Sequence, residues 1–132
     1  MSCCASSFKR FMDREGVRYN DENDNIFITY DVENAGSVTV MVSFDDSGHV
    51  NFLSLPVMEL TQSKFAAALV ACNALNNQYR WVRFYLKDND ICADADAVVD
   101  EDTCGRECME YVLRMVDIID KAYPQLMKVK WA

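Results

Sequence analysis

The stretch IFITYDVENAGSVTVMVSF, residues 26–44, decides the fold. Apolar and polar side chains alternate with a period of two on both sides of Asn34-Ala35-Gly36, which is typical of two antiparallel strands joined by a short loop containing Gly. A slip of one residue would mix the two faces, so the apolar pattern sets the register. The pattern predicts the pairs Val32 with Val38, Tyr30 with Val40, Ile28 with Val42 and Ile26 with Phe44.

Working outward, the periodicity predicts an α+β fold in the order α-β-β-β-α-β-β-α, with an antiparallel sheet packed against helices. A first helix is expected over residues 4–15, and Pro56 is expected to end the third strand. Negative charge at Asp100–Asp102 favours the start of a last helix, which Pro124 should limit. The remaining elements are expected at residues 26–32, 38–44 and 49–55 for strands, 61–76 for a helix with Thr61 as N-cap, and 82–87 and 90–96 for two more strands.

A second hairpin is predicted around the two-residue turn Asp88-Asn89. Its register places Arg83 opposite Asp94 and Lys87 opposite Asp90, so that opposite charges meet on one face. Val82, Phe84, Leu86, Ile91, Ala93 and Ala95 should face inward, and Trp81, Arg83, Tyr85 and Lys87 should face outward.

Length and charge narrow the class of protein. The 132 residues suit one domain, expected to span 1–132, and the net charge of −8 repels phosphate backbones and anionic lipid heads. The first residues have no apolar core typical of a secretory signal, and no apolar run approaches the ~20 residues of a membrane span. We therefore expect a cytoplasmic protein without nucleic-acid or membrane partners, whose six cysteines are thiols.

No motif in the sequence indicates catalysis, a cofactor or a metal site. The only histidine, His49, follows a turn and is expected to be solvated, and no Cys-x-x-Cys occurs. Residues 21–32 begin like a calcium loop, but Ile26 and Val32 occupy the positions that need Gly and Glu. The carboxylates between Asp94 and Asp102 are explained as outward strand residues and helix-start residues. We therefore predict no enzyme, no cofactor and no bound metal.

Two surfaces stand out as candidate binding sites. In the middle helix, Phe65, Leu69, Cys72 and Leu75 should face the sheet, which leaves a second face of small residues to be covered by another helix or by a second subunit. On the sheet, half of the outward-facing side chains are apolar, which suits either a protein-binding surface or ordinary scattered exposure. The candidate dimer interface is Ala67, Val70, Ala71 and Ala74, and the candidate partner-binding surface is Phe27, Met41, Leu53 and Leu55.

The order of elements and the acidity resemble the type III secretion chaperone-like fold and, within it, the bacterial YbjN family. The resemblance rests on Phe8–Met12 before Tyr19, the strand Ile26–Tyr30, residues Ala71–Asn76, and residues Val116–Leu126, which include Tyr123-Pro124. It implies a small dimer that binds extended segments of other proteins, with no catalytic motif. Asn73 and Asn76 would then contact a partner or satisfy the helix end.

Three hypotheses for the function follow. The leading one is a non-enzymatic protein-binding module, chaperone-like or regulatory, that acts as a homodimer. The alternatives are a small-ligand sensor or minor enzyme with a pocket between the helices and the sheet, and a structural subunit of a larger complex. A polar cluster inside a pocket would favour a sensor or enzyme, and a dry apolar groove would favour protein binding.

Overall fold

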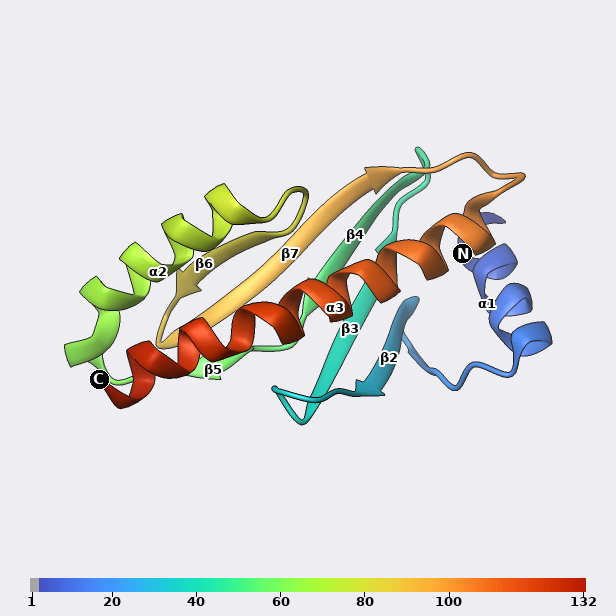
Figure 1. Cartoon of the computed structure of the whole chain (residues 1–132). Helices are drawn as coiled ribbons and strands as arrows, with labels where there is room; N and C mark the ends of the chain where they lie inside the picture. Colours follow the sequence, from blue (N-terminus) through green and yellow to red (C-terminus); the bar gives the residue numbers. More distant parts are fainter. Residues whose placement is uncertain (1–2) are drawn as a thin grey trace.

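The computed structural model describes residues 3–132 (Figure 1). The described chain contains three α-helices, one short 3-10 helix and a seven-stranded antiparallel sheet. The elements are α1 (Cys3–Glu15), β1 (Asn20–Glu22), β2 (Asn25–Asp31), β3 (Ser37–Phe44), β4 (His49–Ser54), β5 (Met58–Glu59), η1 (Gln62–Lys64), α2 (Phe65–Gln78), β6 (Arg83–Lys87), β7 (Asp90–Val98) and α3 (Cys104–Trp131). The α+β class and the order of the main elements agree with the prediction.

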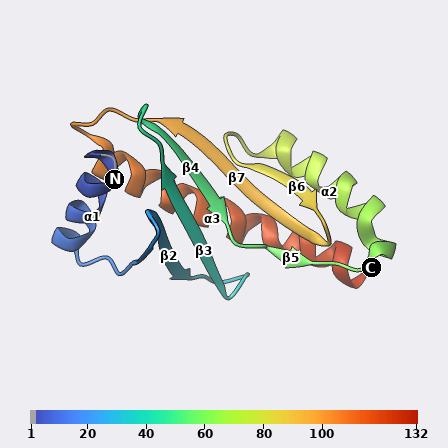
Figure 2. The same ribbon diagram turned by 180° about the vertical axis from the view of Figure 1, so that it is seen from behind.

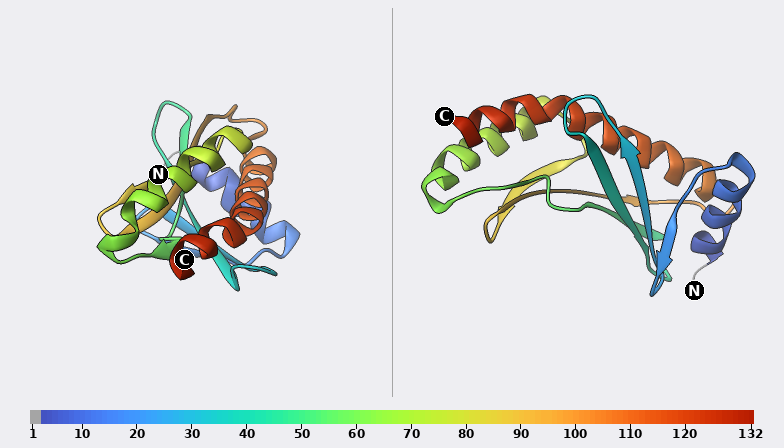
Figure 3. Two further views of the ribbon diagram at one scale, coloured as in Figure 1. Left: turned by 60° about the vertical axis from the view of Figure 1, so that its left-hand side comes forward. Right: turned by 90° about the horizontal axis from the view of Figure 1, so that it is seen from below.

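The helices and the sheet form two layers. The strands run in the order β1-β2-β3-β4-β7-β5, with β6 on the other side of β7. The long helix α3 crosses the sheet, α1 packs beside its N-terminal end, and α2 lies beside β6 (Figures 1 and 2). Seen from below in Figure 3, α2 and α3 lie on the same side of the strands. The opposite face of the sheet, called the outer face below, carries no helix of the described chain.

The hydrophobic core fills the space between the inner face of the sheet and the helices. Alternate residues of each strand point into it because side chains in a strand alternate between faces. The fully buried strand residues are Ile26, Ile28, Val40, Val42, Val50, Phe52, Phe84, Ile91 and Ala93. Each helix adds a buried stripe, namely Phe8 and Met12 of α1, Ala68, Cys72 and Leu75 of α2, and Val112, Met115, Ile119, Ala122 and Leu126 of α3.

The register of the second hairpin confirms the prediction. Arg83 is paired with Asp94 and Lys87 with Asp90, and Ile91, with its neighbours on the inner face, is buried. The Arg83 guanidinium donates two hydrogen bonds to the Asp94 carboxylate, Nε to Oδ1 at 3.1 Å and Nη2 to Oδ2 at 3.0 Å. Turn geometry, apolar alternation and charge agree at this hairpin, so local sequence determines it.

The predicted register of the first hairpin is wrong by two residues. The structure pairs Tyr30 with Val38, Ile28 with Val40 and Ile26 with Val42. A shift of two keeps every side chain on its face, so the apolar pattern cannot distinguish the two registers. The loop is longer than predicted because it is bound to α3. The backbone N–H groups of Asn34 and Ala35 donate to Oδ1 of Asp120 at 2.8 and 2.9 Å.

Pro124 does not end the last helix, contrary to the prediction, since α3 continues to Trp131. A proline inside a helix leaves the carbonyl four residues earlier without its usual partner. Here that carbonyl belongs to Asp120, and it accepts a hydrogen bond from Nδ2 of Asn34 at 3.1 Å. Beyond the proline, Leu126 and Val129 are buried in the core. The hairpin loop thus satisfies the freed carbonyl, and apolar burial stabilises the last turns.

The structure adds elements that the sequence did not indicate. The polar residues around Asn23 and Asp24, for which no strand was predicted, make a hairpin in which β1 pairs with β2. Both turn residues have positive φ, 49° and 66°, as a two-residue hairpin turn requires. After Pro56 the two-residue strand β5 pairs with β7. Thr61 precedes η1 and makes no side-chain cap, so α2 begins at Phe65.

Candidate functional site

The outer face of the sheet carries a continuous row of apolar side chains. Phe27 of β2 is paired with Met41 of β3, and Met41 is paired with Leu53 of β4. The three side chains therefore lie side by side, and each is half-buried by its neighbours. Leu55, just beyond β4, is 45% exposed. The structure thus brings the four predicted surface residues to one uncovered face. The three paired side chains, Phe27, Met41 and Leu53, are called the apolar row below.

Polar side chains flank the apolar row and are bonded to one another. Oγ1 of Thr29 and Oγ1 of Thr39 are 2.8 Å apart on one side of the row. On the other side, Oγ of Ser43 donates to Oδ1 of Asn25 at 2.8 Å. These cross-strand bonds leave the apolar side chains as the part of the surface that gains most from contact with a partner.

Negative charge borders the row on the β7 side. Leu53 is paired with Asp94, whose carboxylate binds Arg83. Next to it, Asp96 accepts hydrogen bonds from Nδ2 of Asn51 at 3.0 Å and lies 3.1 Å from Nε2 of His49. His49 contacts carboxylates here, whereas nucleophilic catalysis would need it beside a thiol or hydroxyl. This negatively charged border of the apolar row favours a partner that carries basic residues.

The outward side of α2 is a second uncovered apolar surface. Ala67 and Ala74 are exposed and Val70 is 72% exposed, whereas Ala71 is half-buried against the core. Neither α1 nor α3 covers Val70, so the first of the two alternatives, that another helix of the chain covers this face, does not hold at Val70. Leu69 was predicted to face the sheet and is 57% exposed; Ala68 takes the inward position. The helix is apolar nearly all round, so the sequence pattern could not fix which side faces inward.

Asn76, near the end of α2, closes the outer edge of β6. Asn76 donates from Nδ2 to the carbonyl of Phe84 at 3.0 Å and accepts from the Phe84 N–H at 2.8 Å. Asn76 therefore satisfies the chain after the helix, as one of the two readings proposed. Asn73 is exposed, and its carbonyl accepts a hydrogen bond from Nδ2 of Asn77 at 3.0 Å.

The predicted outward position of Trp81 is wrong. Its φ is +76°, an uncommon value for a bulky residue, and it turns the indole toward the core. The ring lies 5.7 Å from the ring of Phe52 and 5.0 Å from that of Tyr111, and Nε1 donates to the Asp96 carbonyl at 3.0 Å. Packing and a hydrogen bond together hold the unusual backbone angle, and strand periodicity gives no signal of it.

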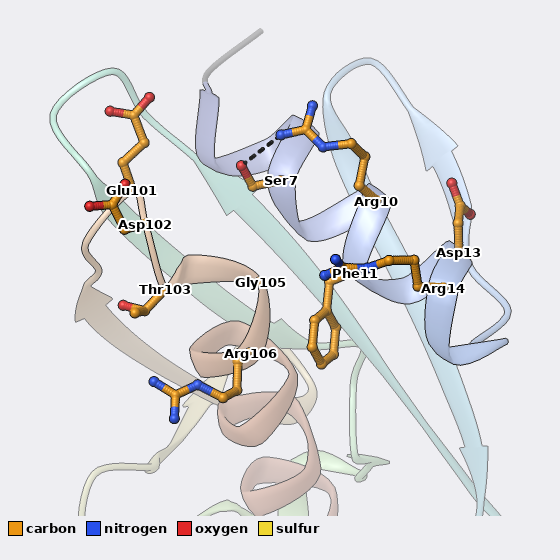
Figure 4. Close-up of a pocket in the computed structure, with 10 residues that line it drawn as sticks. All are labelled: Ser7, Arg10, Phe11, Asp13, Arg14, Glu101, Asp102, Thr103, Gly105 and Arg106. Carbon is orange, nitrogen blue, oxygen red and sulfur yellow. Dashed lines mark hydrogen bonds between the residues drawn. The ribbon is translucent and has the colours of Figure 1, made fainter.

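A cleft between α1 and the start of α3 was not anticipated (Figure 4). It has a volume of about 590 Å³ and is lined by exposed charged side chains around Phe11 and Gly105. In Figure 4, Arg10, Glu101 and Arg106 point away from one another. A catalytic pocket needs polar groups that converge on one point, and this cleft lacks that arrangement. It also lies outside the space between the helices and the sheet where the ligand-sensor hypothesis placed a pocket.

The described cysteines are buried and free, and three of them lie where α1 meets α3. The Cys104 thiol donates to the Cys4 carbonyl with a sulfur–oxygen distance of 3.4 Å. Burial raises the pKa of Cys4 to about 11, and burial also raises the pKa of Cys108. Thiols protonated at neutral pH are poor nucleophiles and poor metal ligands. Within residues 3–132, no group of three His, Cys, Asp or Glu side chains is arranged to hold a metal ion.

The described helices include none that is long and apolar enough to cross a membrane. Together, the fold and its surfaces define a small α+β protein with helices on one face of an antiparallel sheet and a bare second face. The sequence model of the family YbjN, described as "Putative bacterial sensory transduction regulator", matches residues 5–127. The chain therefore belongs to the YbjN family, whose description names a regulator and no enzymatic activity.

A solved structure supports the same fold. The chain is similar to the protein titled "Crystal structure of YbjN, a putative transcription regulator from E. coli", with a TM-score of 0.63 and 12% sequence identity. The similarity covers 89% of this chain and 89% of that chain. No curated protein matched the sequence. At this identity the likeness shows the fold, which agrees with the α+β architecture described above.

Proposed function

We propose that this chain is a non-catalytic regulatory protein that binds a segment of another protein on the outer face of its sheet. One observation carries the proposal: the apolar row of Phe27, Met41 and Leu53 is continuous across three strands, and no helix of the described chain covers it. Exposed apolar surface of this kind is typical of protein-binding sites. Regulation through a protein partner also suits a chain of net charge −8, which repels DNA.

The test compares two substitutions at leucines of matched exposure. Leu55, at 45%, lies on the outer face, and Leu113, at 47%, lies on α3 in the helix layer. The immobilised protein is incubated with extract of cells that express it, and the bound proteins are identified by mass spectrometry. Leu55→Asp should abolish capture of a specific partner, while Leu113→Asp should leave it intact. Equal capture by both variants and the wild type would contradict the proposal.

A second part of the proposal is that the chain acts as a homodimer to which α2 contributes. The support is the exposure of Leu69 and Val70 on a helix whose other outward residues are mostly small. A 14-residue helix is ~21 Å long. Its face is smaller than the ~800 Å² per partner of a typical stable interface, so α2 alone should give a weak, concentration-dependent dimer.

Light scattering across a range of concentrations measures this directly. Val70→Glu places two like charges near a two-fold axis and should yield a monomer of 15.1 kDa. Ala71→Glu is a poorer variant because Ala71 packs against the core and its replacement would disturb the fold. A wild-type monomer at every concentration would exclude the dimer, and a dimer retained by Val70→Glu would place its interface away from α2.

A further inference from the structure

The edges of the sheet differ in how the chain protects them. Unpaired strand edges offer N–H and C=O groups to other chains, and proteins usually block them. The outer edge of β6 is blocked at Phe84 by Asn76, which binds both its N–H and its C=O. The end of β7 is blocked at Asp96 by the Trp81 indole. β5 is only two residues long.

The edge of β2 is open. β1 pairs only with Asn25, Ile26 and Phe27, and within residues 3–132 no strand pairs with residues 28–31 on the side away from β3. Successive residues of a strand alternate between its two edges in the direction of their hydrogen bonds. The Val32 N–H donates to the Gly36 carbonyl across the β2–β3 hairpin. The backbone groups of Thr29 and Asp31 therefore point to the open edge.

The end of α1 explains why β1 does not continue along this edge. Gly16 has a φ of +72°, and the Val17 N–H donates to the Met12 carbonyl at 2.9 Å, which holds the chain against the helix. The Tyr19 hydroxyl donates to Oδ1 of Asp13 at 3.1 Å and keeps the next residues beside α1 as well. The chain therefore diverges from β2 before it turns into β1.

This divergence leaves a hollow of about 710 Å³ along the open edge. Phe27 and Thr29 line it from β2, and Arg18 and Tyr19 line it from the diverging segment. The hollow thus joins the unpaired backbone to one end of the apolar row. A strand placed here would pair with Thr29 and Asp31 and set an outward side chain beside the row.

We propose that the open edge of β2 binds an extended, basic segment of another protein as an additional strand, an inference that rests on the protein-binding function proposed above. Four residues, 28–31, give a pairing length of ~13 Å. Main-chain hydrogen bonds would hold the segment, and alternate side chains would reach the apolar row. Asp31 is exposed on the open edge, and Asp13 and Asp21 line the hollow beside it, so these carboxylates select Lys or Arg in the segment. The same carboxylates disfavour a second copy of this chain, because its own β2 edge is acidic.

The test uses isotope-labelled protein and the synthetic peptide acetyl-Lys-Val-Thr-Val-Thr-Lys-amide, followed by NMR. The backbone amide signals of Thr29 and Asp31 should shift, and their exchange with solvent should slow. The peptide with Glu in place of both Lys residues should bind more weakly. Asp31→Ala and Asp31→Pro form a matched pair, because both lack the carboxylate and only the second lacks the edge N–H. Proline is tolerated where the N–H lies outside the ladder.

Asp31→Pro should bind the peptide about fivefold more weakly than Asp31→Ala, the loss expected for one main-chain hydrogen bond. If Asp31→Pro fails to fold, a peptide with Pro in place of both Thr residues gives the same comparison on unaltered protein. Equal binding within either pair, or signal shifts confined to Met41 and Leu53, would overturn the edge site. Dimerisation without peptide that Asp31→Pro abolishes would identify a second copy as the occupant and would also overturn it.

The failure of this inference differs from the failure of the proposed function. If Leu55→Asp abolishes capture of a partner while the edge variants have no effect, the outer face is the binding site and the edge is not. If Leu55→Asp leaves capture unchanged, the proposed function fails whatever the peptide does.

Discussion

Replacing Asp120 with Ala tests how the long helix holds the first hairpin. The Asp120 carboxylate accepts the N–H groups of Asn34 and Ala35, at 2.8 and 2.9 Å. The substitution leaves both donors without a protein partner. Pro124 is unchanged, so the Asp120 carbonyl still accepts the Asn34 side chain. The variant therefore removes only the contact of the carboxylate with the loop.

The magnitude follows from the two hydrogen bonds. A hydrogen bond to a charged group contributes ~1.5–3 kcal/mol when buried. Asn34 is exposed and Ala35 is only half-buried, so water replaces part of what is lost. We expect a decrease of about 2 kcal/mol in the free energy of unfolding, which for a chain of this size corresponds to a fall of about 8 °C in Tm. Asp120→Asn should lose less, because both N–H groups donate to one oxygen and the amide oxygen of Asn can still accept them, without the negative charge.

Asp117→Ala is the matched control. Asp117 lies one turn earlier on α3 and forms an exposed ion pair with Lys121 at 2.9 Å. Exposed pairs of this kind contribute little, so this variant should unfold like the wild type. Urea denaturation followed by circular dichroism measures all three variants with one baseline. If Asp120→Ala is no more destabilising than Asp117→Ala, the loop is not held by this carboxylate, and the explanation of the hairpin register fails with it.

Three further predictions concern the core and its edges. Gly105→Ala should lower the free energy of unfolding by ~1–3 kcal/mol, because the added Cβ would lie 2.8 Å from Cβ of Phe11; an unchanged Tm would show that α1 and α3 are less tightly packed. Trp81→Phe keeps an aromatic ring but loses the N–H donated to Asp96, and should cost ~1 kcal/mol in urea denaturation; no loss would show that the indole does not seal the edge. Burial holds the pKa of Cys4 at about 11 in the folded chain against the ordinary 9.0, so the folded state retains the proton that the unfolded state loses, and stability should fall as the pH rises from 9.0 to about 11. Cys4→Ala should flatten that fall, and an identical pH profile for this variant would contradict it.

The parts of the fold that local pattern determines were predictable. In the second hairpin, Asp88-Asn89 sets the turn, and Arg83 and Asp94 meet as expected because all the constraints lie within a few residues. The composition of the outer face was also predictable, since strand alternation places Phe27 and Met41 on the same side in either register of the first hairpin.

The fold prediction was wrong mainly where residues far apart in the sequence determine the local structure. The first hairpin takes its register from Asp120, which is 86 residues away from Asn34 in the chain. The same contact lets α3 pass through Pro124, which a local rule treats as a helix end. In α2, apolar residues on every side made the inward face ambiguous, and Leu69 was placed wrongly for that reason.

The openness of the β2 edge could not be read from the sequence. It depends on the way the end of α1 holds Val17, and on Trp81 and Asn76 closing the other edges. A positive φ at a tryptophan has no signal in strand periodicity. Such features need the three-dimensional arrangement, because each joins elements far apart in the chain.

Because the helices cover only one face of the sheet, the two faces differ in how freely their residues can be substituted during evolution. The fully buried side chains of the core lie between the inner face and the helices, and the apolar row of the outer face is only half-buried. Substitutions on the outer face therefore cost little folding free energy compared with substitutions in the core. A protein built this way can exchange one binding specificity for another while its scaffold stays intact. The similarity of this chain to a solved structure at a TM-score of 0.63 and only 12% identity agrees with a scaffold that tolerates extensive substitution.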